Sequence, residues 1–254
     1  MIDFSGQIAL ITGSSRGIGA AIARRFAALG ATVAVHYGTD RTAADATAAT
    51  LDGEGHMAVQ ADVADPAAVR EMVARVVAGL GGIDVLVNNA GTYTEHPLAQ
   101  VTYEAWQHAW RRTIATNLFG AADTTYCVAR HMIDTGRAGR IVNISSRGAF
   151  RGEPRHPAYG ASKAAMNSMS QSLAQHLAPY GITVTTVAPG FVETDMASAY
   201  LQGPHGDAIR GQSPLGRVAT PDEIAGVVAF LASEHAVIAT GAIVDANGAS
   251  YLRT

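Results

Sequence analysis

The sequence has only one cysteine and little charge of either sign. Cys127 alone cannot form an internal disulfide, and this predicts a reducing compartment. The formal net charge of -3 provides no basic field for nucleic acid, and the chain has no basic run. No apolar run approaches the ~18 residues of a membrane span, and the N-terminus lacks the features of a signal peptide. These absences predict a cytoplasmic protein that binds neither nucleic acid nor membranes.

Apolar residues are abundant, at 48% of the 254 positions, and they recur in a regular order. Short apolar runs alternate with longer alanine-rich helical patterns, which indicates βαβ units and a parallel sheet. The expected strands are Ile8–Ile11, Thr32–Tyr37, Met57–Gln60 (the least marked), Val85–Val87, Arg140–Ile144, Thr183–Val187 and Ala242–Val244. The clearest expected helices are Ile18–Leu29, Pro66–Leu80, Ala158–Leu177 and Pro221–Leu231. We therefore expect a single α/β domain, a Rossmann-like doubly wound parallel sheet of about seven strands with helices on both faces.

A glycine-rich turn joins the first expected strand to the first expected helix. It spans Thr12–Gly19, and its glycines allow a tight turn in which a pyrophosphate can rest on helix N–H groups. Its spacing differs from G-x-G-x-x-G, because three residues separate Gly13 from Gly17.

This spacing resembles that of the short-chain dehydrogenase/reductase family, and the resemblance runs essentially from end to end. Asn88–Gly91 is similar to the family's second signature, Asp62-Val63 to its adenine-contacting pair, and Pro189–Thr194 to its nicotinamide-contacting loop. The cofactor-binding residues that the resemblance implies are Gly13, Ser15, Arg16, Gly17, Ile18, Gly19, Tyr37, Asp62, Val63, Asn89, Ala90, Gly91, Tyr159, Lys163, Pro189, Gly190, Val192 and Thr194.

The end of the second expected strand favours NADP(H) over NAD(H). An acid there would bind the ribose hydroxyl and repel a 2′-phosphate, but Tyr37 occupies the position that aligns with that acid. Arg16 and Arg41 are candidates to bind the phosphate through a planar guanidinium. Asp40 would oppose a phosphate unless it caps the following helix.

Tyr159 and Lys163 are spaced i and i+4, which places both on one face of a helix. A neighbouring ammonium favours the phenolate and lowers the tyrosine pKa toward the working range. Ser146 lies thirteen positions before Tyr159, the separation found in the family, and its hydroxyl would hold the substrate oxygen. The resemblance adds Asn117, which would hold a water linking Lys163 to solvent. The resulting catalytic set is Asn117, Ser146, Tyr159 and Lys163, with no metal.

Three functions remain open on the sequence. The first is a 3-oxoacyl-thioester reductase, because residues 181–196 and 241–251 resemble acyl-carrier-protein reductases and Arg137 suits an acidic carrier. Tyr180 departs from that pattern, since such enzymes tend to carry arginine there. The second is a dehydrogenase or reductase of free small alcohols, sugars or ketoacids. The third is an idle nucleotide-binding protein, which the intact catalytic set argues against.

Three further expectations concern the surroundings of the site. Residues 197–216 are weakly patterned, which fits a lid over the substrate or an ordinary surface loop, and we expect the lid. Arg147, Arg151 and Arg155 lie between the catalytic serine and tyrosine, and Arg151 and Arg155 are candidates to clamp an anionic substrate. The resemblance also implies a homotetramer, paired through helices near 103–134 and 158–177 and near the C-terminal strand. Apolar residues that would suit such an interface are Ala121, Cys127, Met166, Met169 and Leu173.

Overall fold

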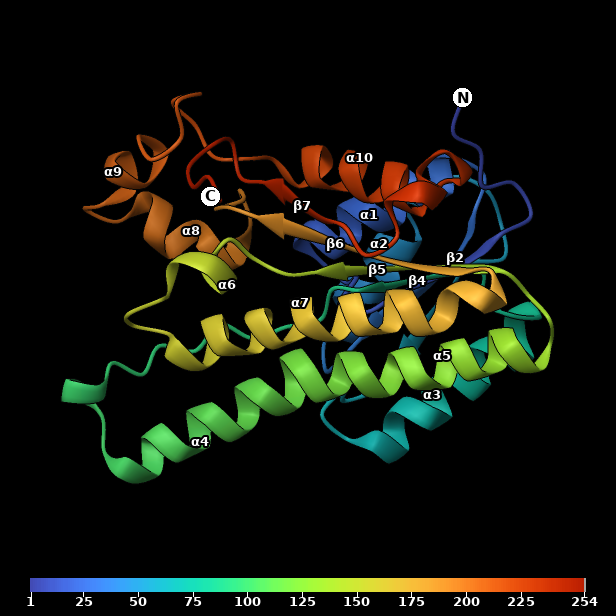
Figure 1. Cartoon of the computed structure of the whole chain (residues 1–254), viewed down its shortest axis with the longest axis horizontal. Helices are drawn as coiled ribbons and strands as arrows, with labels where there is room; N and C mark the ends of the chain where they lie inside the picture. Colours follow the sequence, from blue (N-terminus) through green and yellow to red (C-terminus); the bar gives the residue numbers. More distant parts are fainter. Residues whose placement is uncertain (254) are drawn as a thin grey trace.

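A computed structural model describes residues 1–253 of the chain, and its centre is one parallel sheet (Figure 1). The strands run in the order β3-β2-β1-β4-β5-β6-β7. Their bounds are β1 Ile8–Ile11, β2 Thr32–Tyr37, β3 Met57–Gln60, β4 Val85–Asn88, β5 Gly139–Ile144, β6 Ile182–Pro189 and β7 Ile243–Ala246. All seven expected strands are present: β1, β2 and β3 have the expected bounds, and the ends of the other four differ by at most two residues. The inner strands are almost wholly buried because helices cover both faces.

Helices form a layer on each face of the sheet. One layer holds α1 (Gly17–Ala28), α2 (Arg41–Ala48) and α10 (Pro221–Ala232), which pack on one apolar cluster. The other holds α3 (Pro66–Leu80), α5 (Gly120–Asp134) and α7 (Pro157–Leu177), which pack on a second cluster. Figure 1 shows α4 (Tyr103–Ile114) and α5 as one long rod beneath α7. This three-layer arrangement confirms the predicted fold class.

The chain order of the strands reverses between β1 and β4, and this places the ligand-binding edge. In open parallel sheets a ligand binds outside the carboxyl ends of the strands at such a reversal. In Figure 1 the strands point toward the end of the molecule that carries α6 (Gly148–Arg151), α8 (Asp195–Gln202) and α9 (Gly206–Arg210). Residues 197–216, expected to be weakly patterned, thus contain most of α8 and all of α9.

Local sequence signals explain where several helices begin and end. Asp65 and Thr220 cap α3 and α10, and each helix has proline in its first turn, where a missing N–H costs nothing. Gly81 ends α3 at a φ of 90°, a left-handed conformation that favours glycine. Of the helices in residues 1–253, none combines the length and the apolar character needed to cross a membrane.

Candidate active site

A cavity of about 720 Å³ opens at the carboxyl edge of the sheet, over the chain reversal. Its volume lies in the range of cofactor and substrate sites. Of the eighteen predicted cofactor-binding residues, the cavity wall contains all except Tyr37. Of the catalytic set, Ser146, Tyr159 and Lys163 line the wall, while Asn117 is buried behind it.

The glycine-rich turn fits its role because side chains are excluded by the surrounding backbone. A Cβ on Gly19 would lie 2.3 Å from the carbonyl oxygen of Gly13, and one on Gly13 would lie 2.9 Å from Cα of Ala90. Gly17 has a φ of 57° and opens α1. The turn therefore leaves the N-terminus of α1 uncovered, which suits a pyrophosphate.

Two buried side chains fix this turn, and sequence reasoning missed both. The Thr12 hydroxyl accepts hydrogen bonds from the backbone N–H groups of Asn89 and Ala90, each at 3.0 Å. His36 Nδ1 accepts the N–H of Gly13 at 2.8 Å, and its Nε2 faces the carbonyl of Ala61 at 3.1 Å. Accepting at Nδ1 requires a neutral ring, and burial lowers the pKa of His36 in agreement.

The end of β2 differs from expectation in its details. Tyr37 is 8% exposed and packs in the apolar cluster, so its ring does not line the cavity. Gly38, Thr39 and Asp40 line it instead. Asp40 caps α2 by accepting the N–H of Ala43 at 2.9 Å, as predicted. Arg41 is exposed and paired with Asp45 outside the wall, which leaves Arg16 as the arginine of the glycine-rich turn that faces the cavity.

Lys163 reaches into the site from α7 and is almost completely buried. Its ammonium donates to the carbonyl of Ile144 at 2.7 Å, and Nζ lies 5.7 Å from the ring centroid of Tyr159. Burial lowers the pKa of Lys163 to about 8. The i, i+4 spacing thus brings the two groups together, as the sequence predicted.

The pKa of Tyr159 runs opposite to expectation. Burial raises it to about 12; a hydrogen bond with the Ser146 hydroxyl works against this, and the charge of Glu153 adds to the rise. The loss of hydration outweighs the help of the neighbouring groups of this chain. The phenol is therefore protonated at neutral pH, ready to donate rather than to accept.

The side chains of Ser145 and Ser146 point in different directions, as expected for neighbouring residues of an extended chain. The Ser145 hydroxyl donates to the backbone carbonyl of Lys163 at 3.3 Å, whereas Ser146 faces Tyr159. Ser146 Oγ also accepts the N–H of Gly148 at 3.0 Å, which fixes its rotamer at the start of α6. The serine and tyrosine hydroxyls therefore converge on one point of the cleft.

Asn117 lies in a π-helical turn, η2 (Ala115–Phe119), between α4 and α5. Such turns are rare and gather at functional sites. Its side chain is fully buried, accepts the N–H of Thr92 at 2.8 Å and donates to the carbonyl of Thr92 at 3.0 Å. A further bond reaches the hydroxyl of Ser162, next to Lys163. Asn117 thus connects the loop after β4 to α7.

The comparisons with known proteins agree with this geometry. A family model described as enoyl-(acyl carrier protein) reductase matches residues 13–248. The chain is 40% identical over 252 residues to an uncharacterised oxidoreductase of Methylorubrum extorquens, covering 98% of this chain and 99% of the relative. It is 39% identical over 251 residues to 3-oxoacyl-(acyl-carrier-protein) reductase FabG of Escherichia coli, covering 99% and 100%. The chain belongs to the short-chain dehydrogenase/reductase family. It is an oxidoreductase of that family.

A solved short-chain dehydrogenase of Burkholderia cenocepacia, in complex with NADP, shares the whole fold. The TM-score is 0.87 at 38% identity, covering 97% of this chain and 98% of that one. The predicted membership in the short-chain dehydrogenase/reductase family is therefore confirmed by sequence and by structure.

Beyond the motifs of the short-chain dehydrogenase/reductase family, an aromatic cluster forms the substrate side of the cavity. Tyr93 stacks on His156 with ring centroids 3.6 Å apart, and it meets Tyr159 edge-on at 4.7 Å. The Tyr93 hydroxyl donates to Glu153 at 3.3 Å, and the Tyr200 hydroxyl lies 3.2 Å from His156 Nε2. Sequence reasoning missed Tyr93, His156 and Tyr200 because they come from separate segments with no shared motif.

The arginines between Ser146 and Tyr159 do not form the expected anion clamp. Arg155 pairs with Glu95, and neither Arg151 nor Arg155 lines the cavity. Arg147 lines it and is 3% exposed. The loop turns its middle and end outward, so that of its three arginines only Arg147, next to Ser146, lines the cavity.

Proposed function

We propose that the protein is an NADP(H)-dependent oxidoreductase that interconverts a carbonyl and a secondary alcohol, with Tyr159 as general acid and base. The observation that carries this proposal is the convergence of Ser146, Tyr159 and Lys163 at one end of a cavity whose other end is the glycine-rich turn. When bound there, NADPH would supply the hydride.

The residues present fit that cofactor. The exclusion of a Cβ at Gly13 and Gly19 leaves a backbone cradle for the pyrophosphate. Arg16 faces the cavity, and Asp40, the carboxylate that lines it after β2, already caps α2, which favours a 2′-phosphate. Asp62, which would contact the adenine, is held by Arg112 at 2.9 Å. The relative from B. cenocepacia was solved with NADP, in agreement with this assignment.

In the reducing direction, the chain's own groups hold and protonate the substrate oxygen. Ser146 donates a hydrogen bond to that oxygen, and Tyr159 gives it the phenolic proton. Lys163 stabilises the tyrosinate that remains and would bind the nicotinamide ribose hydroxyls. The protonated state of Tyr159 at neutral pH suits this direction. The water that Asn117 is expected to hold would return a proton to Lys163, while the Asn117 side chain itself bonds Thr92 and Ser162.

The first substrate candidate is a 3-oxoacyl thioester. It rests on the full-length similarity to FabG of E. coli, whose name gives that activity. The second candidate, a free small carbonyl compound, is favoured by two positions at the amino end of the sheet. Tyr180 stands where the carrier-dependent enzymes tend to have arginine, and Arg137 is already paired with Asp84 at 2.8 Å.

We further infer a cytoplasmic homotetramer. Ala121 and Met166 are buried within their own chain, and Cys127, Met169 and Leu173 are half-buried, so the five expected contacts give weak support. Stronger support comes from exposed aromatic side chains along the α4–α5 rod: Tyr103, Phe119 and Tyr126. The lone cysteine agrees with a reducing compartment.

Oxidation of NADPH over a panel of carbonyl compounds tests the proposal. The panel should contain an acetoacetyl thioester on coenzyme A, the same acyl group on an acyl carrier protein, a free 3-oxo ester and a small ketoacid. We expect NADPH to exceed NADH at least tenfold in kcat/KM. A tenfold advantage for NADH would reverse the cofactor assignment, and binding of NADPH without turnover of any compound would favour the idle nucleotide-binding protein.

A further inference from the structure

Arg147 joins three segments at the substrate end of the cavity. Its Nη1 donates to the Ser250 hydroxyl at 2.5 Å, and its Nη2 donates to Gln212 Oε1 at 2.6 Å. The guanidinium carbon lies 5.3 Å from the ring centroid of Phe191, in the loop after β6. One side chain therefore holds the C-terminal segment, the end of the predicted lid and the loop after β6.

The backbone of Arg147 also fixes the catalytic serine. Hydrogen bonding between β5 and β6 continues past the strand ends, because the N–H of Ser145 donates to the carbonyl of Val187 at 2.7 Å. The N–H of Arg147 donates to the carbonyl of Pro189 at 2.9 Å. Ser146 stands between these two bonds, so a shift of residue 147 would move the serine hydroxyl directly.

The lid segment, residues 197–216, packs on an apolar cluster separate from the main core. Ala197, Leu201 and Val218 form this cluster with the partly buried Phe191 and Ile209. Because this cluster is small, it gives the segment a low local stability. The hydrogen bonds between the segment and the rest of the chain therefore contribute more to holding it in place. Ala197 and Tyr200 of this segment line the cavity, so the segment covers substrate when it is docked.

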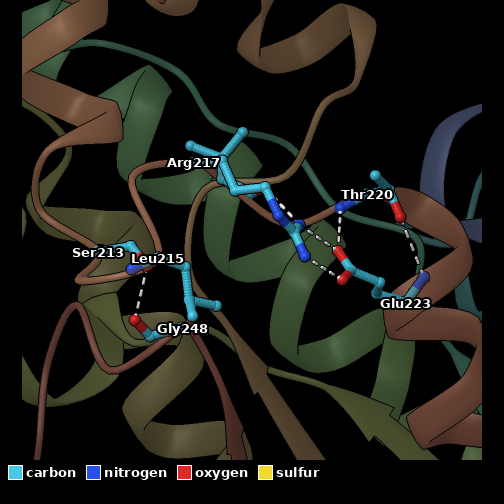
Figure 2. Close-up of polar contacts among 7 residues, drawn as sticks. Ser213, Leu215, Arg217, Thr220, Glu223 and Gly248 are labelled. Atoms are coloured by element: carbon cyan, nitrogen blue, oxygen red, sulfur yellow. Dashed lines mark hydrogen bonds and ion pairs between the residues drawn. The ribbon is translucent and has the colours of Figure 1, made fainter.

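Figure 2 shows how the end of the lid segment is held. The Ser213 hydroxyl donates to the carbonyl of Gly248 at 2.7 Å and accepts the N–H of Leu215 at 3.2 Å. Arg217 and Glu223 form an ion pair just beyond, at the start of α10. Gln212, the partner of Arg147, directly precedes Ser213. The hydrogen bond from Arg147 to Gln212 thus connects the end of the lid segment to the residue that directly follows Ser146.

The charge of Arg147 is costly in this position. The side chain is buried, and among residues 1–253 no carboxylate lies within ion-pair distance of it. A buried charge with only neutral partners is often less stable than an apolar side chain of similar size. Burial accordingly lowers the pKa of Arg147. The guanidinium offers what an apolar group would not, namely directed donors to two segments at once.

We propose that Arg147 is a positioning residue that couples the docking of the lid segment to the placement of Ser146. With the lid docked, Gln212 and Ser250 hold the guanidinium, and the serine hydroxyl is held in line with Tyr159. With the lid displaced, residue 147 loses a partner and Ser146 loses its alignment. This inference rests on the proposed carbonyl-reductase function.

The test compares Arg147→Met, Gln212→Leu, their double variant and Arg147→Lys. We expect Arg147→Met to lower kcat 10- to 100-fold, the loss that a misplaced catalytic group produces, with KM changed less than threefold. The Kd of NADPH should stay within twofold. Arg147→Lys should recover part of kcat. Arg147→Met and Gln212→Leu each remove the same hydrogen bond. The kcat of the double variant should therefore be no more than twofold lower than that of Arg147→Met.

Arg151→Met is the matched control, because Arg151 contacts the same Gln212 at 3.3 Å but its side chain is exposed and does not line the cavity. It should change kcat less than twofold. Multiplicative losses in the double variant, or an unchanged kcat in Arg147→Met, would overturn the proposal. So would a rise in KM confined to acidic substrates, which would make Arg147 an anion-binding residue.

Two further measurements keep the outcome decisive. Should Arg147→Met fail to fold, Gln212→Leu and Ser250→Ala remove the same ties from the partner side and carry the same expected loss. Should the parent enzyme reduce no carbonyl, the proposed function fails. Limited trypsin cleavage after Arg210 then tests independently whether Arg147 holds the lid segment in place. Faster cleavage in Arg147→Met than in Arg151→Met supports the tie, whereas equal rates contradict it.

Discussion

At the scale of single residues, the proposed chemistry depends on two groups whose burial moves their pKa values in opposite directions. Loss of hydration raises the pKa of Tyr159 to about 12 and lowers that of Lys163 to about 8. Burial disfavours the charged form of each, the phenolate and the ammonium. At pH 7 the site therefore holds a neutral proton donor beside a cation that can stabilise the phenolate once the proton has left.

Replacing Tyr159 by phenylalanine tests the proton donor. The ring still packs edge-on against Tyr93, so the fold and the cavity should be kept. We expect kcat to fall at least a thousandfold while the Kd of NADPH changes less than threefold, because only the transferred proton is lost. Residual activity within tenfold of the parent would show that another group donates the proton.

Lys163 is the only lysine in the chain, so its titration can be followed directly. In protein labelled with ¹³C-lysine, its εCH₂ resonance should titrate near pH 8 rather than at the ordinary value of 10.5, because burial disfavours the ammonium. The rate of carbonyl reduction should therefore be constant below pH 8 and decline above it, because Lys163 loses its positive charge there. A titration above pH 10 would contradict the assigned burial.

At the scale of secondary-structure elements, α10 begins with a complete capping box. The Thr220 hydroxyl accepts the N–H of Glu223 at 3.3 Å, and the Glu223 carboxylate accepts the N–H of Thr220 at 2.8 Å (Figure 2). Glu223 also pairs with Arg217, which lies between the lid segment and α10. The cap therefore stabilises the helix and fixes the point where the lid segment ends.

Thr220→Ala removes half of this box. We expect the free energy of unfolding to fall by about 1 kcal/mol, the usual cost of losing a helix cap, measured as a lower urea midpoint. Thr42→Ala is the matched control, since Thr42 is exposed near the start of α2 and makes no side-chain hydrogen bond within residues 1–253. Equal shifts in the two variants would mean that the cap contributes nothing.

At the scale of the whole molecule, exposed aromatic rings along one rod argue for association. Tyr103 is 70% exposed, Phe119 58% and Tyr126 70%, all on the segment that spans α4 and α5. Burying such rings between copies removes apolar surface from water, which is the main force in association.

The expected particle is a homotetramer at micromolar concentration. Light scattering coupled to size exclusion should give four times the chain mass of 26.3 kDa. Tyr126→Glu should shift the mass toward smaller species by placing a charge at the contact, while Tyr180→Glu, on the exposed turn before β6, serves as the control. A monomer mass for the parent chain would be fatal to this prediction.

The sequence by itself determined the features that depend on local spacing. Alternation of apolar runs and helical patterns predicted the parallel sheet, because strands buried on both faces must be apolar along their length. The i, i+4 rule placed Tyr159 and Lys163 together, and the glycines at 13, 17 and 19 identified the turn, where the structure leaves no room for a side chain at Gly13 and Gly19 and gives Gly17 a positive φ. Each of these inferences depends on residues that lie close to one another in the sequence.

Tertiary structure alone decided the contacts between distant segments and the effects of burial. The contact of His36 with Gly13, that of Asn117 with Thr92 and that of Arg147 with Ser250 join residues 23, 25 and 103 positions apart. No local pattern encodes such pairs. Burial was equally hidden: it placed Tyr37 in the core and raised the pKa of Tyr159, because desolvation depends on everything packed around a group and not on its neighbours in sequence.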